Sequence, residues 1–397
     1  MSLMGKINWN PLVALTLFFL SFGIGIWLSL RKPLWNDEIY TQVYSIDQHS
    51  YADIIFHRLV EGNNCPLFYL IQKSICDMSG YHFPLEWDYE WNLADSWSQL
   101  ILRLSSNLFM SLSLALVFYY FATHYSTGVG VYSSLVFFSS YMVWAYWVEA
   151  RPYALWLLLT TIQSLLFLKI LKEKRMDSLI YLSLVFTHLS LSLTSTLSLA
   201  QISVVTLILW IKIDRNLKRY IVLSLIPLGI CFYYYLNSPQ FKFFFLDGMI
   251  DLIHANLPLE RMVIIFLYGL FLLFSLNKSK IPFTAPTQVN KETNEEEELE
   301  GKGYFLLIIL ILLLTLVILF ILKWKDTHGE VGFSISDRYF IYLTPVGIIA
   351  TIVSSVHLVR GLRTYPWLLI NCLMILGGLL IIRCLKTYAD ILALGIY

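Results

Sequence analysis

The sequence predicts an all-α polytopic membrane protein whose helices cross the bilayer about eleven times. The chain of 397 residues is 57% hydrophobic and only 14% charged, and its mean hydropathy is +0.66. A soluble core of this size cannot hide so much apolar surface from water, so lipid must cover much of it. Aromatic residues make up 16% of the chain, and many flank apolar runs, where such rings anchor spans at the membrane interface.

Each span needs about 20 apolar residues. The predicted spans cover residues 11–30, 100–121, 128–147, 153–171, 178–194, 196–213, 220–237, 260–276, 303–322, 339–359 and 366–385. Residues 178–213 are divided at Thr194–Thr196, because one helix of that length would measure about 54 Å and exceed the bilayer. The first run is followed by Arg31-Lys32-Pro33 without a small-residue cleavage site, so we expect a retained span.

Basic residues predict the orientation of the spans. With the N-terminus in the cytoplasm, the inner loops are 172–177, 212–219, 277–302 and 359–363. Each of them carries Lys or Arg, as the positive-inside rule requires. This orientation predicts an integral membrane protein with its N-terminus in the cytoplasm.

Two long segments are not spans, and both belong to a single transmembrane domain covering residues 1–397. Residues 31–99 form a large external loop, in which 51–59 and 66–76 are amphipathic and are expected to lie along the interface. Residues 277–302 form a polar cytoplasmic linker, expected to be a solvated loop. Cys65 and Cys76 share the external loop, and their spacing leaves open whether they pair.

Composition also excludes several classes of function. A net charge of +1 makes nucleic acid an unlikely partner. The sequence contains no dinucleotide-binding glycine fingerprint, no P-loop and no HExxH or CxxC metal motif. We therefore expect no cofactor and no obligatory metal.

Charged residues lie just outside several spans, and the predicted topology brings them to the external face. Asp37-Glu38 follows the first span. The pair is a candidate catalytic base with a supporting acid, because adjacent ionised carboxylates repel each other and one of them then binds a proton more readily. The alternative is an ordinary pair of interfacial acids.

The second charged block is Glu149-Ala150-Arg151-Pro152-Tyr153, in a short external turn. Pro152 suits the first position of the following helix. Arg151 is a candidate anion-binding residue, with Glu149 and Tyr153 orienting substrate. Alternatively, Glu149 and Arg151 simply pair with each other across the turn.

The third block, Asp337-Arg338-Tyr339, begins the tenth span. Ser336 or Asp337 is expected to cap that helix, and the positive helix end together with Arg338 would suit a phosphate. Further candidates are Lys323 and Lys325 for the phosphate, and Tyr339 and His188 for orienting substrate. The two lysines could instead extend to the interface, and His188 could be a buried, hydrogen-bonded histidine.

These blocks together resemble type-C (GT-C) glycosyltransferases. Asp37-Glu38 resembles the acidic motif of their first external loop. Residues 149–155 resemble the ExRxYxL segment of the bacterial branch related to protein O-mannosyltransferases, aminoarabinose transferases and lipopolysaccharide-core sugar transferases, and residues 337–340 resemble its later RY segment. The similarity covers residues 10–360 in layout and these three blocks in detail.

The resemblance implies a bundle with interfacial helices in the first external loop and an inverting transfer of one sugar. The donor would be a polyprenyl-phosphate sugar, and the acceptor a lipid-linked glycan, lipid A or core saccharide, or a protein. Asp37 matches the position assigned as the base in relatives. Relatives often carry further spans or a soluble C-terminal domain that this sequence lacks, so acceptor recognition is left open. The identity of the sugar, the identity of the lipid carrier and the oligomeric state are also left open.

Two other functions compete with this interpretation. A transporter or flippase of a lipid-linked sugar would place charges near the middle of the bilayer and line a path with broken helices. An oligosaccharide ligase or polymerase could use the same architecture. The charges at span ends favour chemistry at the membrane surface.

Overall fold

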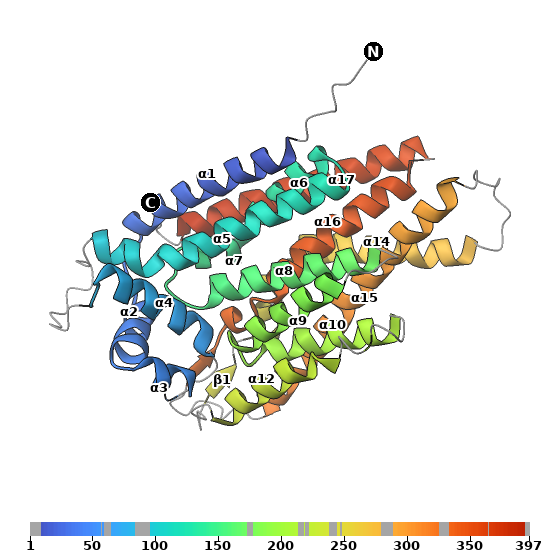
Figure 1. The fold of residues 1–397 in the computed structure, drawn as a ribbon. Coiled ribbons are helices and arrows are strands. Elements are labelled where there is room, and N and C mark those ends of the chain that lie inside the picture. Colours follow the sequence, from blue (N-terminus) through green and yellow to red (C-terminus); the bar gives the residue numbers. More distant parts are fainter. Residues whose placement is uncertain are drawn as a thin grey trace, which may run out of the picture.

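The computed structural model describes residues 9–56, 58, 65–83, 96–172, 178–212, 218, 222–237, 244–246, 248–278, 289–324, 333–363 and 365–393. Helices running side by side dominate the structure, and short helices collect at one end of them (Figure 1). The largest cluster of buried apolar residues lies between the long helices, while the outward faces expose many Leu, Ile and Phe side chains. The predicted all-α polytopic class is confirmed.

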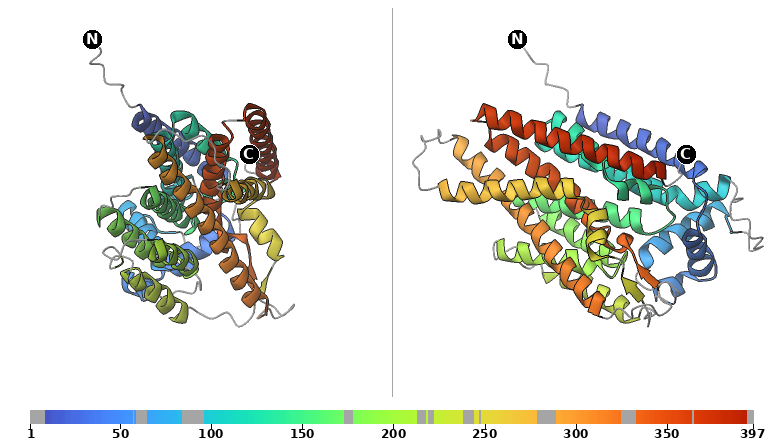
Figure 2. Two further views of the ribbon diagram at one scale, coloured as in Figure 1. Left: turned by 90° about the vertical axis from the view of Figure 1, so that its right-hand side faces the viewer. Right: turned by 180° about the vertical axis from the view of Figure 1, so that it is seen from behind.

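In the described part of the chain, six helices are long and apolar enough to cross a membrane. They are α1 (Asn10–Arg31), α5 (Ser96–His124), α8 (Tyr153–Lys172), α15 (Val289–Trp324, apolar from Leu299), α16 (Leu343–Gly361) and α17 (Pro366–Ala393). In the apolar windows of α8 and α16, 78% and 89% of the residues are buried, whereas α17 has only 11% buried. Helices α8 and α16 therefore form the centre of the bundle, and α17 lies on its outside (Figure 2).

Two of the apolar segments are bent pairs of helices. Helices α6 (Thr127–Phe138) and α7 (Tyr141–Trp147) meet at 70°, and α13 (Met249–Asn256) and α14 (Leu259–Lys278) meet at 79°. The first bend falls at Ser139, whose hydroxyl donates to the Val136 carbonyl and so competes with the helical backbone. The second falls at Pro258, which has no N–H to donate and excludes the preceding residue from the helix. The bend at Ser139 therefore interrupts the span predicted over 128–147, whereas α14 covers the whole span predicted over 260–276 and the bend at Pro258 lies before it.

Three shorter apolar helices complete the bundle: α9 (Ser178–Ser192), α10 (Ser198–Lys212) and α12 (Leu225–Asn237). The predicted division of 178–213 is confirmed, because α9 ends two residues before Thr194 and α10 begins two residues after Thr196. With the six long helices and the two bent pairs, the described residues contain eleven apolar segments, one at each predicted position.

The described residues of the first predicted external loop contain four short helices beyond the end of α1 (blue in Figure 1). They are α2 (Asn36–Tyr40), the π-helix η1 (Thr41–Asp47), α3 (Tyr51–Ile55) and α4 (Pro66–Ser79). Ser50 caps α3 by accepting a hydrogen bond from the Asp53 N–H, and Gly80, at φ 64°, ends α4. Cys65 and Cys76 are both free and buried, so they do not form the pair that their spacing left open.

Two features of the structure were not expected from the sequence. Helix α15 begins at Val289, so part of the linker predicted over 277–302 is helical. Its Glu, Lys and Leu residues are good helix formers, and acidic residues near a helix N-terminus are favourable. In addition, β1 (Phe244–Leu246) pairs in parallel with β2 (Phe333–Ile335), in the register Phe244 to Phe333. This pairing holds the segment that leads into Arg338.

Candidate functional site

Asp37 lies between two arginines that come from distant parts of the chain. Its Oδ2 is 2.7 Å from Arg338 Nη1 and 4.0 Å from Arg151 Nη2. The Asp37 side chain is 33% exposed, that of Arg338 18% and that of Arg151 7%, so the cluster is partly open to solvent. The structure thus brings together the central residue of each of the three charged blocks.

Arg151 is fixed by the segment that carries Asp37. Its Nη1 donates to the Asp37 carbonyl at 3.2 Å and to Thr41 Oγ1 at 2.6 Å. Its guanidinium also lies 5.7 Å from the centre of the Tyr153 ring, and Nη2 is 3.5 Å from the Tyr153 hydroxyl. A guanidinium with this many partners keeps one orientation, so Arg151 presents a preorganised positive charge.

Arg338 lies in a single 3-10 turn, η4 (Asp337–Phe340), and not at the start of the long helix. Ser336 precedes this turn but forms no side-chain cap, so the predicted helix cap was wrong. Asn256 holds the turn instead, because its Nδ2 donates to the Asp337 carbonyl at 2.9 Å. The Arg338 guanidinium lies between two rings, with Trp35 at 5.5 Å and Tyr339 at 5.6 Å.

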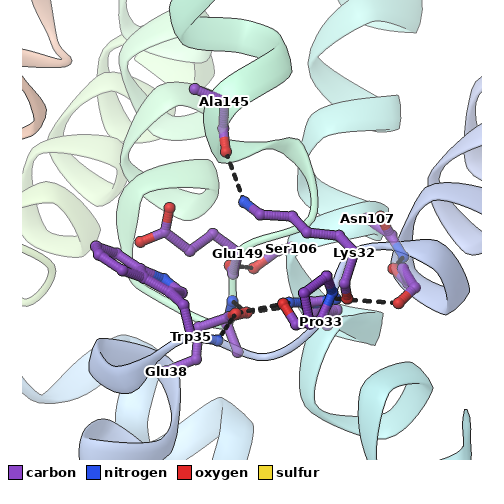
Figure 3. A network of polar contacts seen from close by, with 11 residues as sticks. Lys32, Pro33, Trp35, Glu38, Ser106, Asn107, Ala145 and Glu149 are labelled. Atoms are coloured by element: carbon purple, nitrogen blue, oxygen red, sulfur yellow. Dashed lines mark hydrogen bonds and ion pairs between the residues drawn. The ribbon is translucent and has the colours of Figure 1, made fainter. Parts of the chain in front are cut away.

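Arg103 is a site residue that the sequence analysis missed. It lies in the second turn of α5 and is fully buried. Its Nε and Nη2 donate to the two oxygens of Glu38 at 2.8 and 2.6 Å, and its Nη groups also donate to the carbonyls of Ser29, Lys32 and Pro33. This network joins the end of α1 to α2 (Figure 3). The sequence did contain a signal for Arg103. It lies within the predicted span 100–121, where a charged residue needs a partner, and Asp37-Glu38 supplies two acids that need a cation.

Asp37 and Glu38 therefore face different partners despite being adjacent. Successive residues of a helix point about 100° apart. Glu38 is fully buried, and its Oε1 also accepts the Ala150 N–H at 2.8 Å. Separate cations thus offset the predicted repulsion between the two carboxylates, because Asp37 contacts Arg338 and Glu38 contacts Arg103. Glu38 follows Asp37 in the chain and binds the N–H of Ala150, so it connects the Asp37 segment to the residue before Arg151.

Glu149 is the one predicted site residue whose carboxyl is buried without a full set of partners. It is 3% exposed, and its Oε1 has no hydrogen-bond partner among the described residues. Burial raises the pKa of the Glu149 carboxyl to about 7, although the positive charge of Lys32 opposes that rise. Lys32 itself donates to the Ala145 carbonyl at 3.4 Å, and the Glu149 side chain extends on the side of Trp35 (Figure 3).

The remaining predicted residues lie outside this cluster or cannot be placed. His188 is buried in α9, and its Nδ1 is 3.1 Å from Ser224 Oγ at the start of α12, as expected for a hydrogen-bonded buried histidine. Lys323 is in the last turn of α15, but its side chain lies outside the described structure, as does all of Lys325. Among the described residues, no group of three or more His, Cys, Asp or Glu is arranged to hold a metal. That the protein needs no metal remains a prediction.

The structure also contains an apolar groove. It has a volume of about 630 Å³ and lies between α14 and α15. Leu257 lines one end, and its neighbour Asn256 is the residue that holds the Asp337 carbonyl. The opposite end is lined by Lys302, near the start of the apolar part of α15. Its apolar lining suits a hydrocarbon chain.

Comparisons with known proteins leave the family of this chain open. No family model and no curated protein matches it. Among solved structures, it is similar to ArnT from Cupriavidus metallidurans bound to undecaprenyl phosphate, at 12% identity and a TM-score of 0.45, over 97% of this chain and 73% of that one. The apo state of the same protein gives 11% identity and a TM-score of 0.44, over 95% and 71% of the two chains. Similarity this low identifies neither the fold family nor the activity, so the function is argued from the site itself.

Proposed function

We propose that this protein transfers one sugar from a polyprenyl-phosphate donor to an acceptor on the external face of the membrane, as a type-C glycosyltransferase. The observation that carries the proposal is the contact of 2.7 Å between Asp37 and Arg338, with Arg151 4.0 Å from the same carboxylate oxygen. It joins a candidate base and two candidate phosphate ligands in one partly exposed cluster. The positive-inside rule supports a site outside the cytoplasm, and we propose the bacterial inner membrane as the location.

The two arginines suit a leaving phosphate. They present two positive charges to the single Asp37 carboxylate, while the neighbouring acid Asp337 accepts a hydrogen bond from Tyr146 at 3.3 Å. Charge-assisted contacts in a partly dry site stabilise developing negative charge by several kcal/mol. No cofactor is invoked for this step.

Donor binding would also free the base. In the structure, Arg338 is bound to the oxygen with which Asp37 would accept a proton. A donor phosphate would compete for the same guanidinium, since phosphate oxygens suit its planar donors as well as a carboxylate does. Asp37 would then take a proton from the acceptor hydroxyl only when the donor is in place, which would limit futile hydrolysis.

The sugar would move in a single displacement. The acceptor oxygen attacks the anomeric carbon as Asp37 takes its proton, the bond from that carbon to the phosphate oxygen breaks, and the phosphate leaves with the bonding electron pair. One displacement inverts the configuration. Tyr153 and Tyr339 lie against Arg151 and Arg338 and, together with Glu149, would orient the sugar. The groove between α14 and α15 would hold the first isoprene units.

Substitution at Asp37 tests the proposal. General-base catalysis contributes about 10²–10⁴-fold, so Asp37→Asn should lose that much transfer activity but should still bind the polyprenyl-phosphate donor. Asp77→Asn is the matched control, because it makes the same change at an exposed carboxylate of α4. Near-normal transfer by Asp37→Asn would show that Asp37 is not the catalytic base.

The same assay separates the competing functions. Purified protein in liposomes is given a labelled lipid-linked sugar and an acceptor, and the products are resolved by thin-layer chromatography. Transfer of one sugar supports the proposal, and transfer of many would indicate a polymerase or ligase. Movement of the labelled lipid between leaflets without any product would indicate a flippase.

A further inference from the structure

The turn that carries Arg338 has weak backbone hydrogen bonds of its own. It is a single 3-10 turn, and such turns have poorer hydrogen-bond geometry than an α-helix. The Tyr339 N–H donates to the Ser336 carbonyl at 3.3 Å. The Ile341 N–H donates to the Arg338 carbonyl at the same distance. Contacts from outside the turn are therefore needed to hold Arg338 in one place.

Asn256, the last residue of α13, makes such a contact. Its Nδ2 donates to the Asp337 carbonyl at 2.9 Å and to the Leu252 carbonyl of its own helix at 3.1 Å. Asn256 is fully buried, so these hydrogen bonds are not shared with bulk solvent. Because Asp337 directly precedes Arg338, the Asn256 side chain joins α13 to the residue before the arginine.

Thr344 fixes the direction of the Asn256 amide. This residue lies in the first turn of α16 and is fully buried, and its Oγ1 donates to Asn256 Oδ1 at 2.9 Å. A carbonyl oxygen only accepts hydrogen bonds, so the end of the amide that faces the Leu252 and Asp337 carbonyls is the NH₂ group. A reversed amide would place Oδ1 against two carbonyl oxygens. The amide therefore has one orientation.

The backbone next to Asn256 is also packed against α16. Leu257 is fully buried and lies against Gly347, which is three residues beyond Thr344 and so on the same face of α16. A Cβ added at Gly347 would be only 2.5 Å from Leu257 Cδ1, so the glycine permits this close approach. The end of α13 thus has a defined position relative to α16, from which Asn256 reaches the turn.

We infer that Asn256, oriented by Thr344, is a positioning residue for Arg338. The amide acts through the Asp337 carbonyl and holds the turn so that the Arg338 guanidinium lies 2.7 Å from the Asp37 carboxylate. The inference rests on the proposed function in one respect, which is that Arg338 there binds the donor phosphate. The effect of Asn256 on the arginine itself can be measured without any donor.

Modification of arginines by phenylglyoxal, followed by mass spectrometry of the unliganded full-length protein, tests the positioning. Asn256→Leu is similar in size but cannot donate to the Asp337 carbonyl. Arg338 should then react about 2- to 10-fold faster, the range expected for the loss of one hydrogen bond. Arg151 is the internal reference, because its contacts to α2 and η1 do not involve Asn256. Its rate should not change, whereas a general loosening of the site would raise both rates.

Thr344 offers milder variants in case Asn256→Leu does not fold. Thr344→Val removes the hydroxyl at nearly constant shape and should also raise the rate at Arg338, whereas Thr344→Ser keeps the hydroxyl and should restore it. Thr351→Val is the matched control, because the Thr351 hydroxyl donates to the Gly347 carbonyl within α16. Unchanged modification of Arg338 relative to Arg151 in both Asn256→Leu and Thr344→Val would overturn the inference.

Titration with a polyprenyl phosphate separates this inference from the proposed function. Asn256→Leu and Arg338→Gln should each raise Kd, and the double variant should bind no more weakly than Arg338→Gln alone, because the amide acts through that arginine. Losses that multiply in the double variant would overturn the inference. Normal binding by Arg338→Gln, together with faster modification of Arg338 in Asn256→Leu, would support the positioning and reject the phosphate role of Arg338 in the proposed function.

Discussion

Replacing Glu149 by glutamine should stabilise the protein in a pH-dependent way. Burial raises the pKa of this carboxyl from its ordinary value of 4.5 to about 7. Between these two pH values the folded protein keeps a proton that the unfolded chain has lost, so stability falls as the pH rises through this window. Above pH 7 the penalty is complete. A pKa difference of about 2.5 corresponds to about 3 kcal/mol.

The amide of Glu149→Gln has no such penalty. At pH 8 we expect the variant to be more stable than the unsubstituted protein by about 3 kcal/mol, and near pH 4 we expect the two to be equal. The entropy of unfolding is about 2.1 cal/mol/K per residue, so 397 residues give about 0.8 kcal/mol/K and a shift of about 4 °C at pH 8.

Tryptophan fluorescence during heating in detergent measures the unfolding temperatures of the two proteins at each pH. Asp251→Asn is the control, because it removes a carboxylate that is exposed on α13. A shift that is the same at pH 4 and pH 8, or a variant that is less stable at pH 8, would show that the Glu149 carboxyl is not held in an environment that penalises its charge.

Three further outcomes follow from the contacts of the site. Arg103→Met should cost about 3–5 kcal/mol in unfolding free energy, because it leaves Glu38 buried without its cation, and Arg103→Met combined with Glu38→Met should recover most of that loss in denaturant titrations. Arg338→Lys should retain the charge but lose the planar fork, and should weaken binding of a polyprenyl phosphate measured by isothermal calorimetry; unchanged binding would argue against a phosphate at this residue. Leu306→Trp should fill the groove and raise KM for long-chain donors but not for a short-chain analogue, and equal effects on both would place the chain elsewhere.

The sequence was sufficient to predict the number and order of the apolar segments. Hydropathy and segment length depend on neighbouring residues alone, so they identified all eleven segments and the division at Thr194–Thr196. The convergence of Asp37, Arg151 and Arg338 was also predictable, because an even or odd number of crossings decides which ends share a face. These three residues are the part of the candidate site that topology alone places together.

Other features depend on contacts between distant residues, which periodicity does not record. We expected Glu38 to act together with Asp37 because the two are adjacent in the sequence, but in the structure Glu38 forms an ion pair with Arg103 on α5. The bend at Ser139 is stable because Arg261, Arg383 and Thr387 bond the freed carbonyls from other helices. His188 was grouped with the site by residue type alone, and the fold places it against Ser224.

The positions of the acid and its counter-charge along the chain have a consequence for biosynthesis. Asp37 leaves the ribosome with the first span, Arg103 and Arg151 follow soon after, and Arg338 emerges only when synthesis is nearly complete. A truncated or stalled product would therefore contain the carboxylate without its main cation. If the proposed donor binding needs that cation, then no partly translated chain can consume lipid carrier, and activity would appear only after the tenth segment has inserted.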